Sequence, residues 1–201
     1  MISAVILAAG EASRMGRLKQ LLPWGDRTIL GTVINNIQES ELDGQVRVVL
    51  GAESERIKTK LSDYDCQFLT NPDYTRGMFS SVMTGIKDLP SKTTGLLFML
   101  ADQPLVTTDI YNQLINYFKK EEPLLLVPSY NQRRGHPLII SAELIPEIYK
   151  LGEDGDPEGG LRALLDKYED EIAYYNLDQE GVIIDLDYYE DYQKYYSDHH
   201  S

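Results

Sequence analysis

Residues 3–8 read SAVILA, and residues 95–100 read GLLFML. Neither stretch contains a charged residue, and each has the length of a strand rather than that of a helix. A continuous apolar run of this length predicts a β-strand buried on both faces, which is typical of a parallel sheet covered by helices. The two stretches therefore indicate the α/β fold class.

Strand-like and helical patterns alternate along the rest of the chain. Strand patterns occupy residues 46–50, 66–69, 124–127, 137–140, 172–176 and 181–185. Helical patterns occupy residues 29–40, 54–61 and 78–89, begin again near residues 108, 143 and 161, and end in a tyrosine-rich helix. Thr28 and Ser54 are placed to cap the first two helices. We predict a single domain, residues 1–201, with an open, mostly parallel sheet in a three-layer α/β/α arrangement.

The distribution of charge limits the classes of partner. The chain has 19 basic and 32 acidic residues among 201, a formal net charge of −13. Residues 1–60 contain 8 basic and 7 acidic residues, whereas residues 150–201 contain 4 basic and 15 acidic ones. Nucleic acids are bound through clustered lysine and arginine, so this distribution argues against a nucleic-acid partner. Small anions can still be bound by glycine-rich backbone and a few placed cations.

Cysteine and histidine are too few for an internal disulfide or a structural zinc site. The single cysteine, Cys66, begins the strand-like segment CQFL, and we predict that it is a small core residue. Any bound metal is therefore expected to be a hard cation held by oxygen. No stretch approaches the roughly 18 apolar residues of a membrane span, and the amino terminus lacks a basic leader, so we expect a cytoplasmic protein with no membrane partner.

The loop of residues 8–19 follows the first apolar strand. In open α/β sheets, ligands bind beyond the carboxyl ends of the strands, so this loop is a candidate binding site. Gly10 and Gly16 permit backbone amides to approach phosphate oxygens, and Arg14 and Lys19 add positive charge. The loop has neither the GxxxxGK[ST] nor the GxGxxG spacing. An ordinary strand-to-helix turn with two solvated cations is the alternative interpretation.

Asp102, Gln103 and Pro104 follow the second apolar strand directly. A carboxylate at this point is suited to hold Mg²⁺ against a triphosphate, because magnesium prefers one or two carboxylates together with phosphate oxygens and water. The alternative is an aspartate that caps a helix or closes a turn. The predicted sheet places Asp102 beside the glycine loop, which favours the metal-binding role.

A series of motifs in a fixed order extends over almost the whole chain. Residues 7–19 read LAAGEASRMGRLK, and they are followed by NPDYTRGMFSSVMTG (71–85), LADQPLV (100–106), RGHP (134–137), GDPEGGLR (155–162) and IIDLDYYEDY (183–192). The first is similar to the signature LAAGxSxRMGxxK of the MobA/MocA-like nucleotidyltransferases, and the others resemble that family's later motifs. The resemblance implies a Rossmann-like fold of the nucleotide-diphospho-sugar transferase type. It also implies an enzyme that transfers a nucleoside monophosphate to a small phosphorylated acceptor and releases pyrophosphate.

The resemblance implies roles for the residues of the first motif and for two aspartates. The nucleotide would be cradled by Leu7, Ala8, Ala9, Gly10 and Gly16, with Arg14 and Lys19 on its phosphates. Asp102 would be the first Mg²⁺ ligand, and Asp187 the second, in the position of the family's DTPED motif. That motif reads DYYED here, without the proline, which leaves Asp185 as a rival ligand. Catalysis would then come from Lys19, Arg14 and Asp102, which position the phosphates and neutralise their charge.

The resemblance also indicates the nucleotide and the acceptor. Ala9 and Gln103 match the LAAG and DQP elements of the family members that use CTP. Further binding residues are implied in the GMFSSV and RGHP segments: Gly77, Ser80 and Ser81 for the nucleotide, and Arg134 and His136 for a pterin acceptor. Helix capping is an alternative role for the two serines, and a purely structural role is an alternative for the histidine. The stretched GDPEGGLR segment leaves the alignment of Asp156 and Arg162 open.

These observations predict transfer of CMP from CTP to molybdopterin, the organic part of the molybdenum cofactor. Two alternatives remain from the sequence. One is a nucleotidyltransferase that acts on a sugar phosphate or polyol phosphate. The other is a protein that binds the molybdenum cofactor and delivers it to a molybdenum hydroxylase without transferring a nucleotide.

Overall fold

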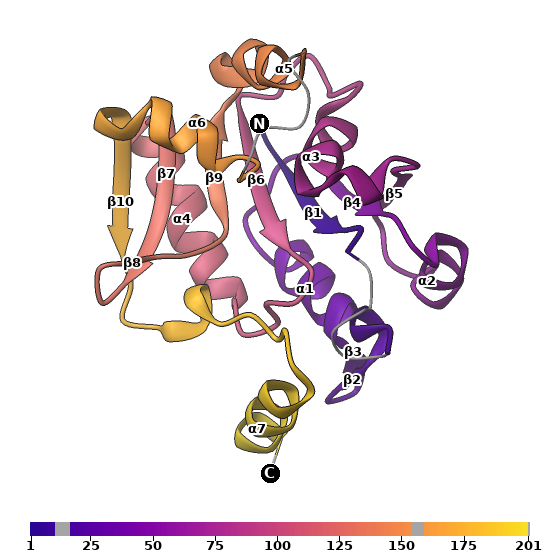
Figure 1. The fold of residues 1–201 in the computed structure, drawn as a ribbon. Coiled ribbons are helices and arrows are strands. Elements are labelled where there is room, and N and C mark those ends of the chain that lie inside the picture. The colour runs from indigo at the N-terminus through magenta and orange to yellow at the C-terminus, as the bar shows by residue number, and fades with distance from the viewer. Residues whose placement is uncertain (11–16, 154–158, 201) are drawn as a thin grey trace.

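The computed structural model describes residues 1–10, 17–153 and 159–200, and a β-sheet lies at its centre (Figure 1). In the described ranges the strands of this sheet are β1 (Ile2–Ala8), β4 (Val46–Leu50), β5 (Gln67–Thr70), β6 (Gly95–Leu100), β7 (Leu125–Tyr130), β8 (Arg133–Arg134), β9 (Leu138–Ser141) and β10 (Ile172–Asn176). Their order is β10-β7-β9-β6-β1-β4-β5, with β8 paired to β7. A separate hairpin consists of β2 (Pro23–Trp24) and β3 (Arg27–Thr28).

The two apolar stretches that indicate the fold class are neighbours in the middle of the sheet. β1 pairs in parallel with β6 and with β4, and Leu7 lies opposite Leu100 in the register. The pairs β4–β5 and β7–β10 are also parallel, whereas β9 runs antiparallel to both β6 and β7. The prediction of a mostly parallel sheet is confirmed. Because β1 and β6 end side by side, the loops that follow them are brought together.

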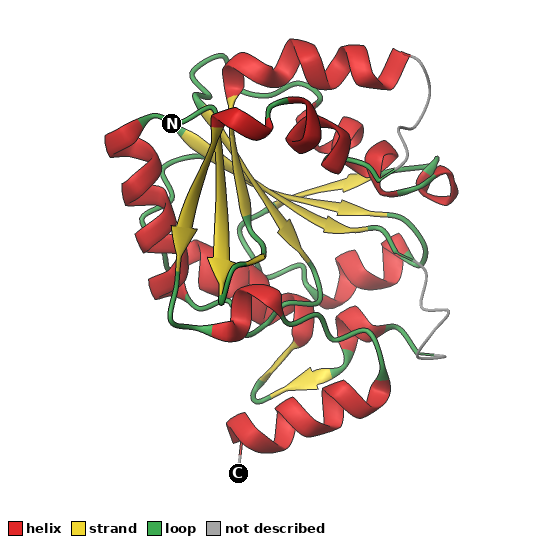
Figure 2. Ribbon diagram, turned by 60° about the vertical axis from the view of Figure 1, so that its left-hand side comes forward, coloured by secondary structure: helices red, strands yellow, loops and turns green. Residues whose placement is uncertain are grey.

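Helices cover both faces of the sheet, as Figure 2 shows. One face is covered by α1 (Ile29–Gln38) and α4 (Thr108–Glu121), and the other by α3 (Met78–Ile86), α5 (Ile145–Glu153) and α6 (Arg162–Lys167). Helix α2 (Ser54–Lys60) lies near the β4–β5 edge, and α7 (Tyr189–His200) lies beyond the carboxyl end of the sheet. Short 3₁₀ turns occupy Lys19–Leu21, Tyr74–Arg76, Ala142–Leu144, Glu169–Glu171 and Glu180–Ile183. The three-layer α/β/α prediction is therefore confirmed.

The packing of β1 explains why its sequence is almost entirely apolar. Ala4 and Ile6 face the core formed with α1 and α4, whereas Val5 faces the core formed with α3, and all three side chains are fully buried. Successive side chains of a strand point to opposite faces, so a central strand covered by helices is apolar on both faces. Ser3, the one polar residue of β1, is also fully buried. Burial of an aliphatic side chain such as Ile6 contributes about 1.5–3 kcal/mol to folding. None of the helices in the described ranges is long and apolar enough to cross a membrane.

The first two helices differ in how their amino-terminal ends are capped. The hydroxyl of Thr28 accepts a hydrogen bond of 3.0 Å from the N–H of Gly31, so the predicted cap of α1 is confirmed. The predicted cap of α2 by Ser54 is wrong, because Ser54 is the first helical residue. Glu53 precedes it in the left-handed region, with φ of 55°, and makes no capping hydrogen bond through its side chain.

The predicted strand at residues 181–185 is also wrong. This segment is a 3₁₀ turn over Glu180–Ile183 followed by an extended stretch that crosses the carboxyl end of the sheet. It makes single hydrogen bonds instead of a ladder: the N–H of His136 donates to the carbonyl oxygen of Val182, and the N–H of Leu186 donates to that of Asp102. Val182 and Leu186 are fully buried, which accounts for the strand-like apolar pattern.

Cys66 lies one residue before β5, at the edge of the sheet, and is half-buried. The prediction of a buried strand at residues 66–69 is therefore wrong in its burial, since β5 is an edge strand with exposed residues at both ends. Burial, with a contribution from the charge of Asp65, raises the pKa of the Cys66 thiol to about 11. The thiol stays protonated near neutral pH, which is consistent with a packing role.

Candidate functional site

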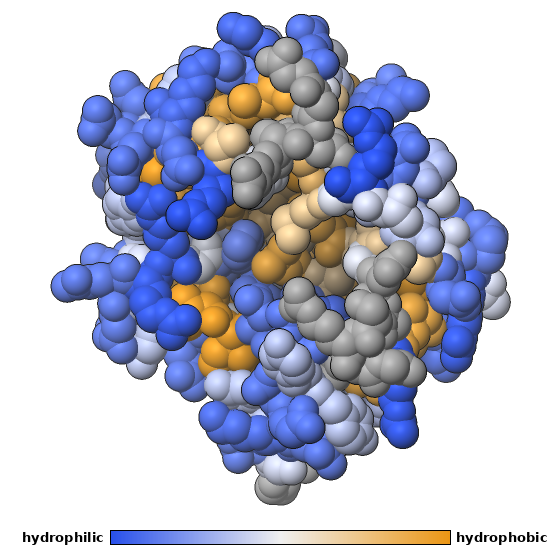
Figure 3. Space-filling view, viewed as in Figure 1, coloured by the Kyte–Doolittle hydropathy of each residue, from blue (hydrophilic) through white to orange (hydrophobic). Residues whose placement is uncertain are grey.

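A cleft of about 550 Å³ opens where β1 and β6 end. It is lined by Leu7, Ala8, Ala9, Gly10, Arg17, Lys19, Gln20, Tyr74, Thr75, Gly77, Met78, Ser81, Leu100, Ala101, Asp102, Asp185 and Asp187. The face of the molecule seen in Figure 3 is hollowed near its centre, with apolar side chains on the floor and hydrophilic ones around it. The carboxyl ends of central strands thus form a cleft, as expected for an open α/β sheet.

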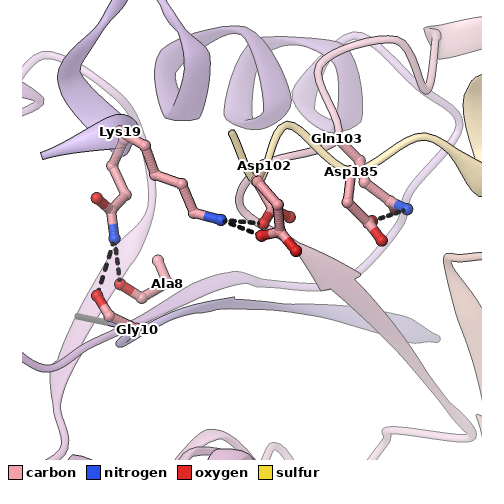
Figure 4. Close-up of polar contacts among 8 residues, drawn as sticks. Ala8, Gly10, Lys19, Asp102, Gln103 and Asp185 are labelled. Atoms are coloured by element: carbon pink, nitrogen blue, oxygen red, sulfur yellow. Dashed lines mark hydrogen bonds and ion pairs between the residues drawn. The ribbon is translucent and has the colours of Figure 1, made fainter. Parts of the chain in front are cut away.

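Three charged side chains from distant parts of the chain meet in this cleft. Lys19 lies in the 3₁₀ turn after the glycine loop, Asp102 follows β6, and Asp187 precedes α7. The Nζ atom of Lys19 lies 2.5 Å from Oδ2 of Asp102 and 3.0 Å from Oδ1 of Asp187 (Figure 4). Burial lowers the pKa of Lys19, but the charges and hydrogen bonds of the two carboxylates outweigh it and raise that pKa. Lys19 is therefore a cation at any neutral pH.

Backbone contacts fix the positions of the two carboxylates. The N–H of Ala101 donates to the carbonyl oxygen of Leu7 at 3.3 Å, which extends the pairing of β6 with β1 up to Asp102. The N–H of Leu186 donates to the carbonyl oxygen of Asp102 at 3.0 Å. The segment that carries Asp187 is thereby attached to the end of β6.

Asp185 also lines the cleft, but it has a different partner. Gln103, which is 3% exposed, donates from Nε2 to Oδ1 of Asp185 at 2.8 Å (Figure 4). Burial raises the pKa of Asp185, and so does the negative charge of Asp102, against the hydrogen bond from Gln103. Gln103 does not line the cleft itself; its side chain holds a carboxylate that does. Only Asp187 of the two rival aspartates shares a cation with Asp102 among the described residues.

The sequence interpretation missed Gln20, which organises the turn after β1. Its side chain is 2% exposed, and Nε2 donates to the carbonyl oxygens of Ala8 at 3.2 Å and Gly10 at 3.4 Å (Figure 4). Its Oε1 atom is buried without a hydrogen-bond partner in the described part of the chain. The signal in the sequence is a polar residue within LKQLL, where the pattern calls for an apolar one. A Cβ on Gly10 would meet nothing within 4 Å, so its backbone borders open cleft.

The GMFSSV segment forms another wall of the cleft. Gly77 has φ of 130° and lies at the start of α3, with Met78 and Ser81 beside it in the lining. The hydroxyl of Ser80 lies 2.7 Å from the carbonyl oxygen of Gly77 and does not reach the cleft lining. Ser80 does not cap α3, because its hydroxyl donates to carbonyl oxygens and the helix has no side-chain cap hydrogen bond, whereas Ser81 lines the cleft and accepts a hydrogen bond from Asn71. Tyr74 and Thr75, also in the lining, were not singled out from the sequence.

Arg134 and His136 do not line the cleft. Arg134 is exposed on β8, where Nη2 lies 3.2 Å from Oε1 of Glu169 and the guanidinium lies over the ring of Tyr174. Burial lowers the pKa of the His136 imidazole, against the charge of Asp102, so the ring is neutral at pH 7. Its backbone N–H supports the segment of Val182 that leads to Asp185 and Asp187.

Some residues singled out from the sequence have no described structure or lie away from the cleft. Arg14, Gly16 and Asp156 are outside the described residues. Arg162 is exposed at the start of α6, and its Nε atom lies 3.8 Å from a carboxylate oxygen of Asp166. Leu7, Ala8 and Ala9 do line the cleft, as predicted for a loop that receives a ligand.

The two carboxylates that contact Lys19 are suited to bind a hard divalent cation, provided that a substrate and water supply its other ligands. Asp102 and Asp187 supply two carboxylates, and both already share one cationic partner. Within the described residues no group of three or more His, Cys, Asp or Glu side chains is arranged to hold a metal alone. Two carboxylates completed by phosphate oxygens and water are the environment that magnesium prefers.

This geometry agrees with comparisons to known proteins. Residues 4–172 match the family described as "MobA-like NTP transferase domain". The chain belongs to the MobA-like NTP transferase family. Membership makes the chain a nucleotidyltransferase, and it confirms the resemblance seen in the sequence.

Individual relatives differ in the activity that their names state. The chain is 28% identical to the molybdenum cofactor cytidylyltransferase of Escherichia coli (strain K12), over 95% of this chain and 93% of that protein. It is 31% identical to the nicotine blue oxidoreductase of Paenarthrobacter nicotinovorans, over 73% and 74%. Among solved structures, Rv0371c from Mycobacterium tuberculosis H37Rv superimposes with a TM-score of 0.83 over 98% of this chain and 97% of that one, at 23% identity. The fold is thus shared with Rv0371c over nearly the full length of both chains.

Proposed function

We propose that this MobA-like protein transfers CMP from CTP to the phosphate of a molybdopterin-type molybdenum cofactor and releases pyrophosphate, with Mg²⁺ as the metal. The observation that carries the proposal is the meeting of Lys19, Asp102 and Asp187 where β1 and β6 end. The likeness to the E. coli cytidylyltransferase over 95% of the chain supports the choice of nucleotide and acceptor. Ala9 and Gln103, the two positions that match the CTP-using pattern, support it further.

The nucleotide is assigned to the wall formed by β1 and the turn after it. Leu7, Ala8, Ala9 and Gly10 border the cleft, and Gln20 holds two of the carbonyl oxygens of this turn away from the ligand. Because those carbonyl oxygens are hydrogen-bonded to Gln20, they repel an anion less, and the backbone N–H groups of the turn can bind it. Gly77 and Ser81 form the opposite wall. Gly16 and Arg14, outside the described residues, keep the phosphate-binding roles implied by the family motif.

Mg²⁺ is assigned to the carboxylates of Asp102 and Asp187, with Asp185 held aside by Gln103. When bound, the metal supplies positive charge to the α-phosphate and to the departing pyrophosphate. The two carboxylates that now hold the ammonium of Lys19 are the ones assigned to the metal. Lys19 is then free to donate hydrogen bonds to phosphate oxygens.

The reaction needs no covalent intermediate on the protein. An oxygen of the acceptor phosphate bonds to the α-phosphorus of CTP, and the bond from that phosphorus to the bridging oxygen breaks, so pyrophosphate leaves with the electron pair. Lys19 orients the phosphates and neutralises charge that develops on them. The neutral His136 and the exposed Arg134 lie outside the described cleft lining, so the pterin-binding role of both stays a prediction from the sequence.

The proposal is tested by pyrophosphate release from purified protein with Mg²⁺ under anaerobic, reducing conditions. Molybdenum cofactor is offered with CTP, GTP, ATP or UTP in separate reactions, and we expect release with CTP. If pyrophosphate is released only when a sugar phosphate or polyol phosphate replaces the cofactor, the acceptor belongs to that class instead. Binding of the cofactor with no release from any triphosphate would contradict transfer and favour a carrier that serves a molybdenum hydroxylase.

A further inference from the structure

Arg17 is a cation in the cleft that the family signature does not assign. It lies in the lining between Gly10 and Lys19, and its side chain is exposed. Within the described residues no carboxylate lies within ion-pair distance of its guanidinium, although the cleft contains three aspartates and the protein has a net charge of −13. Lys19, the other described cation of the lining, has both of its carboxylate partners at hand.

The guanidinium of Arg17 is held by an aromatic ring instead. Its central carbon lies 5.3 Å from the ring centroid of Tyr189, which begins α7 two residues after Asp187. A guanidinium that covers a ring uses its face for this contact and keeps its N–H donors at the edge of the plane. The contact therefore fixes Arg17 beside the cleft without consuming the donors that bind phosphate.

The element that carries Tyr189 is itself attached to the amino-terminal part of the site. The hydroxyl of Tyr192 donates to the carbonyl oxygen of Pro23 at 3.0 Å, and the ring of Trp24 packs against Tyr192 and Tyr196 at centroid distances of 6.3 and 5.9 Å. Helix α7 thus lies against the β2–β3 hairpin, next to the turn that carries Lys19 (Figure 2). The tyrosine-rich helix α7 therefore helps to position the residues of the site, in addition to covering apolar surface.

We propose that Arg17 is an additional triphosphate-binding residue and that Tyr189 is its positioning residue, so α7 belongs to the nucleotide site. The inference rests on the proposed function. A nucleoside triphosphate beside three aspartates is stabilised by each further cation, and within the described residues the N–H donors of Arg17 at the same cleft have no hydrogen-bond partner. Lys19 contacts both carboxylates assigned to the metal and is therefore placed at the α-phosphate, and Arg17 is assigned to the phosphates that leave as pyrophosphate.

Isothermal titration calorimetry measures two affinities of each variant, one for CTP in the presence of Mg²⁺ and one for CMP. We expect Arg17→Ala to weaken CTP binding about tenfold, as for loss of one charge-assisted hydrogen bond, and to leave CMP binding within about twofold. Tyr189→Ala should weaken CTP binding about threefold, and Tyr189→Phe should bind as the wild type, because the ring face is retained. Thermal unfolding of each variant checks that it folds.

Two variants serve as matched controls. Tyr188→Ala removes the neighbouring, exposed tyrosine, and Arg56→Ala removes an exposed arginine from α2; neither should change the ratio of CTP to CMP affinity. An unchanged ratio in Arg17→Ala, with a wild type that binds CTP, would overturn this inference alone. Failure of the wild type to bind any of the four nucleoside triphosphates would overturn the proposed function, and this inference with it.

Discussion

At the scale of single residues, Lys19 links the two aspartates assigned to the metal. It contacts them through one atom, Nζ, and its own side chain is about one-fifth exposed. The pair is mostly buried, so the attraction between its charges is largely offset by the hydration that they lose, whereas a cation beside developing negative charge contributes to rate. Lys19 is therefore expected to matter for turnover more than for stability.

Replacement of Lys19 tests this separation. We expect Lys19→Met to lower kcat about 100-fold, and to reduce the free energy of unfolding by about 1–2 kcal/mol, because Asp102 and Asp187 lose their shared cation. Steady-state pyrophosphate release and urea unfolding measure the two quantities. Lys58→Met is the matched control, because Lys58 on α2 pairs with the exposed Glu55 and should leave both unchanged. Normal kinetics in Lys19→Met would restore the interpretation of this loop as an ordinary turn.

Two glycines near the site have different physical roles. A Cβ at Gly181 would lie 2.5 Å from the carbonyl oxygen of Leu105, whereas a Cβ at Gly10 would meet nothing within 4 Å. We expect Gly181→Ala to reduce the free energy of unfolding by about 1–3 kcal/mol. Gly10→Ala should change it by less than about 0.5 kcal/mol but weaken CTP binding, since the added methyl group enters the cleft.

Chemical denaturation and calorimetry measure the two effects. Full stability in Gly181→Ala would mean that the segment leading to Asp185 and Asp187 is less tightly packed than the structure indicates. Unchanged CTP affinity in Gly10→Ala would place the ligand away from this turn.

At the scale of elements, the start of β1 is held by a charged side chain. Asp43 accepts a hydrogen bond from the N–H of Ile2 at 2.7 Å, and Oδ2 lies 3.3 Å from Nζ of Lys119. Burial raises the pKa of Asp43, but this hydrogen bond and the charges of Lys119 and the amino terminus outweigh it, so the pKa is lowered. A lowered pKa in the folded state means stability that is present above the unfolded pKa and is lost as pH falls through the folded value.

Asp43→Asn should therefore be less stable than the wild type at pH 7, by under about 1 kcal/mol because the group is half-exposed. The difference should shrink as the pH falls below about 4. Urea unfolding of both proteins at pH 7 and pH 3 measures it. A difference that stays constant between these pH values would contradict a role for the carboxylate charge.

The sequence predicts best the strands whose apolar or alternating pattern lies between clear turn signals. The strands at residues 46–50, 95–100 and 172–176 begin and end as predicted, because each follows directly from apolar or alternating runs between turns. Residues 181–185 have the same pattern but form a turn, since their apolar side chains enter the core from a crossing segment. Apolar periodicity reports burial, and pairing partners decide whether a buried segment is a strand.

The same distinction applies to the site. Lys19 and Asp102 were predictable together, because each follows one of two central strands that the sheet places side by side. The contact of Asp187 with Lys19 joins residues 168 positions apart and depends on the path of the last segment. Gln20 and Arg17 carried only weak signals, since their roles depend on the carbonyl oxygens and the ring that they contact.

At the scale of the whole molecule, the amino-terminal strand and the carboxyl-terminal segment form one site. The end of β1 supplies part of the cleft wall, the turn after β6 supplies Asp102, and the segment before α7 supplies Asp185 and Asp187. The net charge of −13 is unfavourable for an anionic substrate, so affinity depends on local cations and on a metal. We therefore expect nucleotide binding to require a divalent cation.

We infer that Asp102 is needed for turnover and not merely for folding. The most direct measurement is pyrophosphate release from CTP, with Mg²⁺ and molybdenum cofactor, by the wild type, Asp102→Asn and Asp109→Asn, an exposed aspartate on α4. We predict that Asp102→Asn loses at least about 1,000-fold in kcat while it remains folded, and that Asp109→Asn retains normal turnover. A folded Asp102→Asn variant with turnover near that of the wild type would show that this carboxylate is not needed to bind the metal for transfer.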